Sequence, residues 1–127
     1  MATRAYVSFD YDHDNDLKVM LIGQAANSDS PFTISDTSIK DATTDWKTKA
    51  RARIKNSDVV AIICGEWTHT AAGVSAEVKI AQEEGKPYFL LKGRPDKTCT
   101  KPVGTKDNDK MYPWNWPNLK NLIGGGR

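Results

Sequence analysis

The segment from Asp58 to Cys64 constrains the fold of this chain more than any other. Six consecutive apolar residues (Val-Val-Ala-Ile-Ile-Cys) follow Asp58. A strand with one face in water alternates apolar and polar residues, whereas a parallel strand covered on both faces is apolar almost throughout. We therefore interpret residues 58–64 as a central strand of a parallel sheet that has a layer of structure on each side.

The rest of the chain alternates between strand and helix patterns. The other expected strands are residues 5–9, 31–35 and 86–92, and the expected helices are residues 14–26, 44–56, 71–84 and 117–123. Thr44 is a suitable N-cap for the second helix, and Gly85 is a suitable stop for the third. Such alternation is typical of an α/β domain. We predict a three-layer, flavodoxin-like fold with a central parallel sheet flanked by helices.

Length and net charge bear on the number of domains and on whether the chain binds nucleic acid. The 127 residues suffice for one domain with a modest core. We expect a single domain over residues 1–127, with its core at about 4–92, a loop and short helix at 93–123 and a flexible end at 124–127. A net charge of +2 is too small to indicate nucleic-acid binding.

Other sequence features bear on localisation. No apolar run approaches the roughly 20 residues of a membrane span, and the first residues lack the apolar segment of a signal peptide. Cys64 and Cys99 are expected to remain free thiols, because disulfides are rare in reducing compartments. We expect a cytoplasmic protein that contacts neither membrane nor nucleic acid.

Ligands of open parallel sheets bind outside the carboxyl ends of the strands, so three loops are candidate sites. Residues 9–16 carry four aspartates, which suit either a divalent cation or the start of a helix. Asp10, directly after the strand, is the one most expected to reach a site. Residues 35–41 form either a surface connection or part of the same site. Residues 65–73 offer hydroxyls and backbone N–H groups to a phosphate or ribose.

Two other kinds of site are not expected. His13 and His69 lack the spacing of zinc ligands, so we predict no metal site. Ser8 and Ser75 lack the G-x-S-x-G surroundings of a hydrolase nucleophile.

One carboxylate falls on the apolar side of the expected third helix. At about 100° per residue, Val74, Val78 and Ala81 share one face of that helix, and Glu77 lies within the same apolar arc. Such a glutamate is either a paired structural group or a functional group just beyond the central strand. The pattern of residues leaves both interpretations open.

Several of these segments, in this order, resemble parts of TIR domains. Residues 4–10 (Arg-Ala-Tyr-Val-Ser-Phe-Asp) resemble the opening TIR strand, and residues 86–91 resemble a later one. Residues 58–65, followed by Val-Ser-Ala-Glu at 74–77, resemble the third TIR strand and its helix. The resemblance covers most of residues 4–92 and is strongest to short bacterial and archaeal TIR-like proteins, including those of Thoeris antiphage systems. The aromatic segment from Tyr112 to Trp116 also resembles a segment of the proteins in that group.

The resemblance implies an enzyme, an NAD+ nucleosidase or ADP-ribosyl cyclase, that cleaves the nicotinamide–ribosyl bond of NAD+. In Thoeris systems a cyclic ADP-ribose-type product activates a partner effector in antiphage defence. Glu77 matches the catalytic glutamate, which engages the ribose. Phe9 would pack on a ring of the substrate. The other residues expected to line the substrate site are Asp10, Ser35, Asp36, Gly65 and Thr68.

The resemblance further implies that NAD+ is a substrate and that no cofactor is held permanently. Related domains are often active only after self-association. Many of them carry a tryptophan four residues before the glutamate, where this chain has Gly73.

Two alternatives remain. The chain would fit a non-catalytic TIR-like interaction module, or a receiver-like or flavodoxin-like signalling domain. Asp10, Asp12 and Lys92 resemble the acidic pocket and lysine of a receiver. A receiver also needs an aspartate at the end of its central strand, where this chain has Cys64 and Gly65.

Overall fold

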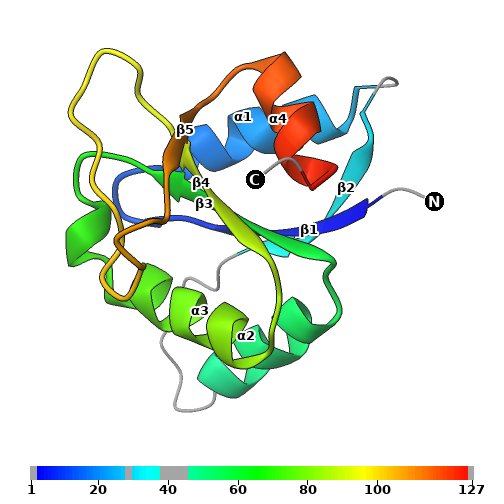
Figure 1. Ribbon diagram of the computed structural model, residues 1–127, viewed down its shortest axis with the longest axis vertical. Helices are drawn as coiled ribbons and strands as arrows, with labels where there is room; N and C mark the ends of the chain where they lie inside the picture. Colours follow the sequence, from blue (N-terminus) through cyan, green and yellow to red (C-terminus); the bar gives the residue numbers. More distant parts are fainter. Residues whose placement is uncertain (1–2, 28–29, 38–45, 126–127) are drawn as a thin grey trace.

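The computed structural model describes residues 3–27, 30–37 and 46–125 (Figure 1). Its described strands form one parallel sheet in the order β2-β1-β3-β4-β5. The strands are β1 (Thr3–Ser8), β2 (Phe32–Thr37), β3 (Val59–Cys64), β4 (Tyr88–Lys92) and β5 (Met111–Pro113). The order places β3 between β1 and β4, at the centre of the sheet.

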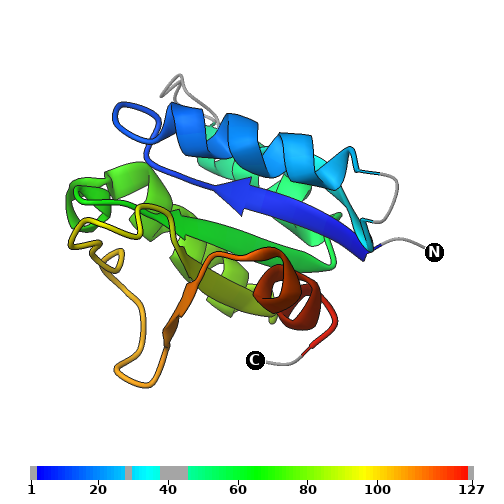
Figure 2. The same ribbon diagram turned by 90° about the horizontal axis from the view of Figure 1, so that it is seen from above.

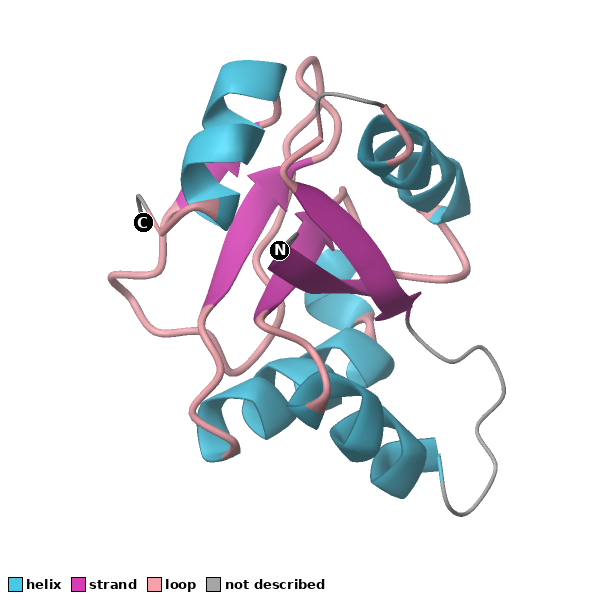
Figure 3. Cartoon of the chain, turned by 90° about the vertical axis from the view of Figure 1, so that its right-hand side faces the viewer, coloured by secondary structure: helices cyan, strands magenta, loops and turns pink. Residues whose placement is uncertain are grey.

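Helices cover both faces of the sheet, so the fold has three layers (Figures 1 and 3). The helices are α1 (Asn15–Ala25), α2 (Trp46–Lys55), α3 (Ala72–Glu83) and α4 (Trp116–Ile123), and a short 3-10 turn, η1 (Thr68–Thr70), precedes α3. Helices α1 and α4 cover one face and α2 and α3 the other (Figure 1). The predicted three-layer α/β fold is confirmed.

Strand β3 supplies side chains to both halves of the core. Every residue of β3 is buried. Alternate residues beginning at Val59 pack with α1 and α4, and those beginning at Val60 pack with α2 and α3. The apolar run arises because neither face of this strand meets water.

Most element boundaries lie within two residues of those expected, but one strand was not predicted. Residues 93–116 were expected to be a loop, whereas Met111–Pro113 forms β5 and pairs with Leu90–Lys92. A three-residue edge strand that contains a proline gives no alternating pattern to read. Gly85 follows α3 with a φ of 66°, in agreement with its expected role as a stop. The expected N-cap Thr44 lies outside the described residues.

The carboxyl ends of β1, β3 and β4 meet at one edge of the sheet. The segment between β4 and β5 lies at this edge (Figure 2). Two backbone hydrogen bonds hold it there, from Gly93 N to Cys64 O at 2.8 Å and from Thr100 N to Gly65 O at 2.9 Å. Within the described ranges, no helix has the length and apolar character that a membrane span requires.

Candidate functional site

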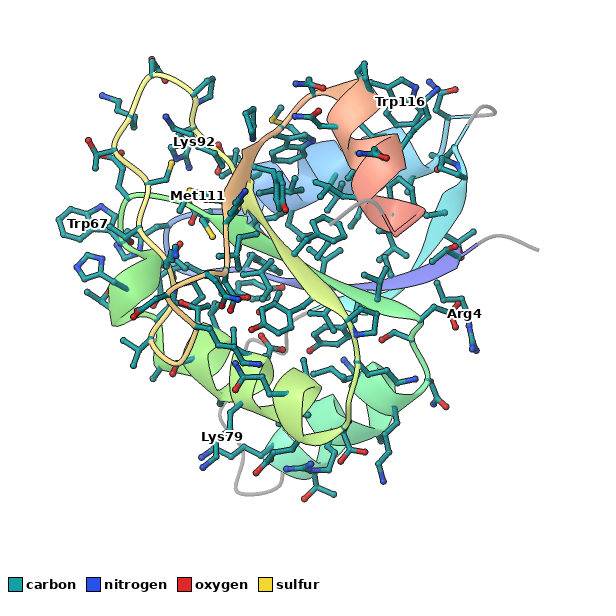
Figure 4. The ribbon with its side chains drawn as sticks, viewed as in Figure 1. Arg4, Trp67, Lys79, Lys92, Met111 and Trp116 are labelled. Atoms are coloured by element: carbon teal, nitrogen blue, oxygen red, sulfur yellow. The ribbon has the colours of Figure 1, made fainter. Side chains whose placement is uncertain are left out.

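Glu77 lies on the face of α3 that packs against the sheet, and only 1% of its surface is exposed. Ser8 Oγ donates a hydrogen bond to Glu77 Oε1 at 2.8 Å, and the Tyr6 hydroxyl donates to Glu77 Oε2. Tyr6 and Ser8 are two residues apart on β1, so their side chains point to the same face of the sheet. Lys79, by contrast, points away from the sheet into solvent (Figure 4). A glutamate of the helix layer is thus held by two hydroxyls of a central strand.

The burial of Glu77 was predicted from helical periodicity, whereas its two partners were not. Taking a carboxylate out of water costs several kcal/mol unless hydrogen bonds compensate. Tyr6 and Ser8, both fully buried, provide two such bonds. A sequence signal existed, since both residues are polar and alternate with the apolar residues Ala5, Val7 and Phe9 in a segment that is buried.

The structure does not bring Phe9 to Glu77. Phe9 belongs to the core cluster on the α1 and α4 side of the sheet, where its ring centroid lies 4.8 Å from that of Tyr11. The alternation that directs Tyr6 and Ser8 toward α3 directs Phe9 to the opposite face.

Asp10 is nearly buried, and it organises the loop between β1 and α1. Asp10 Oδ1 accepts a hydrogen bond from Asp12 N at 3.1 Å, and Asp10 Oδ2 lies 2.7 Å from His13 Nδ1. These contacts are local and tie the loop to itself. In the part of the chain that the structure describes, no group of three or more His, Cys, Asp or Glu side chains is suited to hold a metal ion.

Gly65 and Thr68 are brought together at the carboxyl end of β3. Gly65 N donates to Thr68 Oγ1 at 2.7 Å, and both residues are buried. The Thr68 hydroxyl therefore closes the loop before α3.

Ser35 and Asp36 belong to β2 rather than to the loop after it. Asp36 is paired in register with Tyr6, and the register shifts between Ala5 and Tyr6, so Ser35 is the extra residue of a bulge. Their side chains lie outside what the structure describes. The backbone register nevertheless places this irregularity beside Tyr6, one of the two residues that hold Glu77.

Asp14 is a buried acid that the sequence analysis did not distinguish from the other three aspartates of residues 9–16. It is 1% exposed, its Oδ1 accepts from Arg94 Nη2 at 3.2 Å, and its Oδ2 has no partner among the described residues. Burial raises the pKa of the Asp14 carboxyl, and Arg94 opposes that shift. Arg94 was not predicted as a partner, because 80 residues separate the two in the chain.

Asp14 should give the stability of the protein a measurable pH dependence. A raised pKa means that the folded state holds the proton of Asp14 more tightly than the unfolded chain does. The contribution of Asp14 to the stability of the fold is therefore present at low pH and lost as the pH rises through the folded pKa. We expect Asp14→Asn to become more stable relative to wild type as the pH rises from the ordinary pKa of an aspartate through the raised pKa of folded Asp14. Urea unfolding at several pH values measures the difference.

Asp16→Asn is the matched control for this prediction. The Arg94 hydrogen bond lowers the pKa of Asp16, so its contribution is present above the ordinary pKa and lost on acidification. Wild type should therefore gain stability relative to Asp16→Asn as the pH rises. Equal slopes for the two variants would contradict the assignment of Asp14.

A shallow pocket of about 220 Å³ lies beyond the carboxyl edge of the sheet. Trp67, which is 51% exposed, projects outward from the molecule (Figure 4), and its ring centroid lies 5.8 Å from that of His13. The lining residues are His13, Asp14, Glu66, Trp67, Arg94 and Lys97. Glu77 is not among them, so the pocket and the buried carboxylate are separate features of the same edge.

Comparison with known proteins identifies the family. The family model described as "Thoeris protein ThsB, TIR-like domain" matches residues 6–97, which is more than half of the 127 residues. The comparison with curated proteins gave no match. The matched range includes β1 from Tyr6 onward and the whole of β3 and α3, and so contains Tyr6, Ser8 and Glu77. The chain therefore belongs to the TIR-like domain family of the Thoeris protein ThsB.

Proposed function

We propose that this TIR-like domain cleaves the nicotinamide–ribosyl bond of NAD+, with Glu77 as its catalytic carboxylate. The observation that carries the proposal is the buried Glu77, held by Tyr6 and Ser8 on the helix after the central strand. The product would be a cyclic ADP-ribose-type signal for an effector in Thoeris defence. NAD+ would be a substrate of a cytoplasmic, single-domain protein, with no cofactor held permanently.

The reaction needs a carboxylate more than it needs an acid. When the bond between ribose C1′ and the nicotinamide nitrogen breaks, its electron pair leaves with the ring, which becomes neutral nicotinamide. Positive charge develops on the ribose, as in glycoside hydrolysis. A fixed carboxylate in a site of low dielectric constant stabilises that charge. An internal nucleophile of ADP-ribose then gives the cyclic product, or water gives the linear one.

In the isolated chain Glu77 is buried, and this limits the access of NAD+ to its carboxylate. With 1% of its surface exposed, the glutamate can meet NAD+ only after neighbouring groups rearrange. We propose that self-association provides this rearrangement. The specific activity should then rise with protein concentration.

The test is to incubate the purified protein with NAD+ over a range of protein concentrations and to separate the products by chromatography. We expect nicotinamide and an ADP-ribose product in equal amounts, with a cyclic isomer among the nucleotide products. An extract of phage-infected cells serves as a source of the trigger. No nicotinamide at any concentration, with or without the extract, would overturn the proposal.

The same hydrogen bonds also favour one alternative, a non-catalytic interaction module in which Glu77 only joins α3 to β1. That alternative predicts no turnover of NAD+ and partner binding that survives substitution of Glu77. The enzyme proposal predicts turnover that depends on this glutamate.

A further inference from the structure

We infer that Tyr6 and Ser8 are positioning residues that fix the carboxylate of Glu77 for the reaction. The inference rests on the proposed function, and it assigns roles to two residues of β1. Neither residue would touch the reacting bond, and both would act through Glu77.

The first support is the geometry of the two hydrogen bonds. Ser8 donates to Oε1 and Tyr6 donates to Oε2, so each carboxylate oxygen has its own donor. The last torsion angle of a glutamate side chain is soft. Donors at two fixed points determine the plane of the carboxylate, which a single donor would leave free to rotate.

The second support is the rigidity of the strand that carries the donors. β1 pairs with a strand on each side: Tyr6 lies opposite Asp36 and Val60, and Ser8 lies opposite Ile62. Both donors are fully buried, so their positions are also determined by packing. A site built on a paired strand is held more accurately than a site built on a loop.

The third support is that a stable core does not require this polar group. Buried polar or ionic groups can often be replaced by well-packed apolar residues without loss of stability. The surrounding cluster is largely apolar and includes Val74, Val78 and Ile62. Three polar side chains that converge at the carboxyl end of β1 are therefore better explained by function than by packing.

The expected effect is on the chemical step rather than on substrate binding. A misplaced carboxylate stabilises the charged transition state less well but changes the ground-state complex little. We expect Tyr6→Phe and Ser8→Ala each to lower kcat by about 10- to 100-fold, with KM changed by less than about threefold. The assay is steady-state nicotinamide release, with the folded fraction of each variant checked by thermal unfolding.

Matched controls remove comparable hydroxyls elsewhere in the same protein. The Tyr88 hydroxyl donates to Asp109 Oδ2 at 2.5 Å, and the buried Ser57 donates to Ile54 O at 2.7 Å. Tyr88→Phe and Ser57→Ala should lower stability by similar amounts and leave kcat at the wild-type value. A merely structural role for Tyr6 and Ser8 predicts the same behaviour for all four variants.

The arms of the experiment separate this inference from the proposed function. Wild type and Glu77→Gln decide whether the protein is a Glu77-dependent enzyme, and if it is not, the inference falls with the function. If it is, wild-type kcat in folded Tyr6→Phe and Ser8→Ala overturns the inference and leaves the function standing. Should Ser8→Ala fail to fold, Tyr6→Phe decides, because it keeps the ring and removes only the oxygen.

Discussion

Replacing Glu77 with glutamine is expected to lower the rate of nicotinamide release by about 10³-fold while the protein stays folded. Glutamine keeps the length and shape of the side chain, and its amide oxygen accepts one of the two hydroxyl hydrogen bonds. The other hydroxyl can turn to accept from the amide nitrogen, since a hydroxyl both donates and accepts. The negative charge is lost, and with it the stabilisation of the ribose cation.

Glu83→Gln is the matched control for this prediction. Glu83 lies on the same helix, but its side chain is 45% exposed and pairs with Arg51 at 2.7 Å. This substitution removes the same charge from α3 and should leave nicotinamide release unchanged. If Glu77→Gln released nicotinamide at a rate within about tenfold of the wild-type rate, Glu77 would not be the catalytic carboxylate.

Replacing Gly65 with alanine is expected to destabilise the fold by about 2 to 3 kcal/mol. A Cβ atom at this position would lie 2.3 Å from Asp14 Oδ2, 2.5 Å from Oδ1 and 2.6 Å from Cγ. Asp14 is 1% exposed and pairs with Arg94, so it cannot move away without breaking that contact. Chemical denaturation of the variant measures the loss.

A second substitution tests whether Asp14 causes this loss. In an Asp14→Ala background, all three contacting atoms are gone, so Gly65→Ala should cost clearly less than it does in the wild type. Gly73→Ala is the positive control, because no atom lies within 4 Å of a Cβ there and the residue is in α3. That variant should gain about 0.5 to 1 kcal/mol. Additive effects at Gly65 and Asp14 would show that the cost arises elsewhere.

The layers of the fold could be predicted from the sequence because they depend on local periodicity. The apolar run of β3 indicated a strand covered on both faces, and the helical period placed Glu77 in the buried face of α3. β5 could not be predicted, because it is a strand only through its pairing with Leu90–Lys92. Local patterns thus predict which face of an element is buried.

The partners within the site could not be predicted, because they depend on contacts between distant parts of the chain. Tyr6 and Glu77 are 71 residues apart, and Asp14 and Arg94 are 80 apart. Phe9 shows that residues adjacent in sequence can also lie in different environments. It is next to Ser8 in sequence, yet the pleat of the strand places it on the other face of the sheet. Proximity in sequence therefore does not place Phe9 beside Glu77, and distance in sequence hides the contact between Arg94 and Asp14.

The alternation along β1 has a consequence for how this family can diverge. Ala5, Val7 and Phe9 pack with α1 and α4, whereas Tyr6 and Ser8 serve the glutamate of α3. The two sets share a backbone but no side-chain environment, so selection can act on them separately. Apolar substitutions at positions 5, 7 and 9 that are compensated by repacking against α1 and α4 can therefore leave the two hydrogen bonds to Glu77 in place. A change at position 6 or 8, by contrast, removes a hydrogen-bond donor to Glu77.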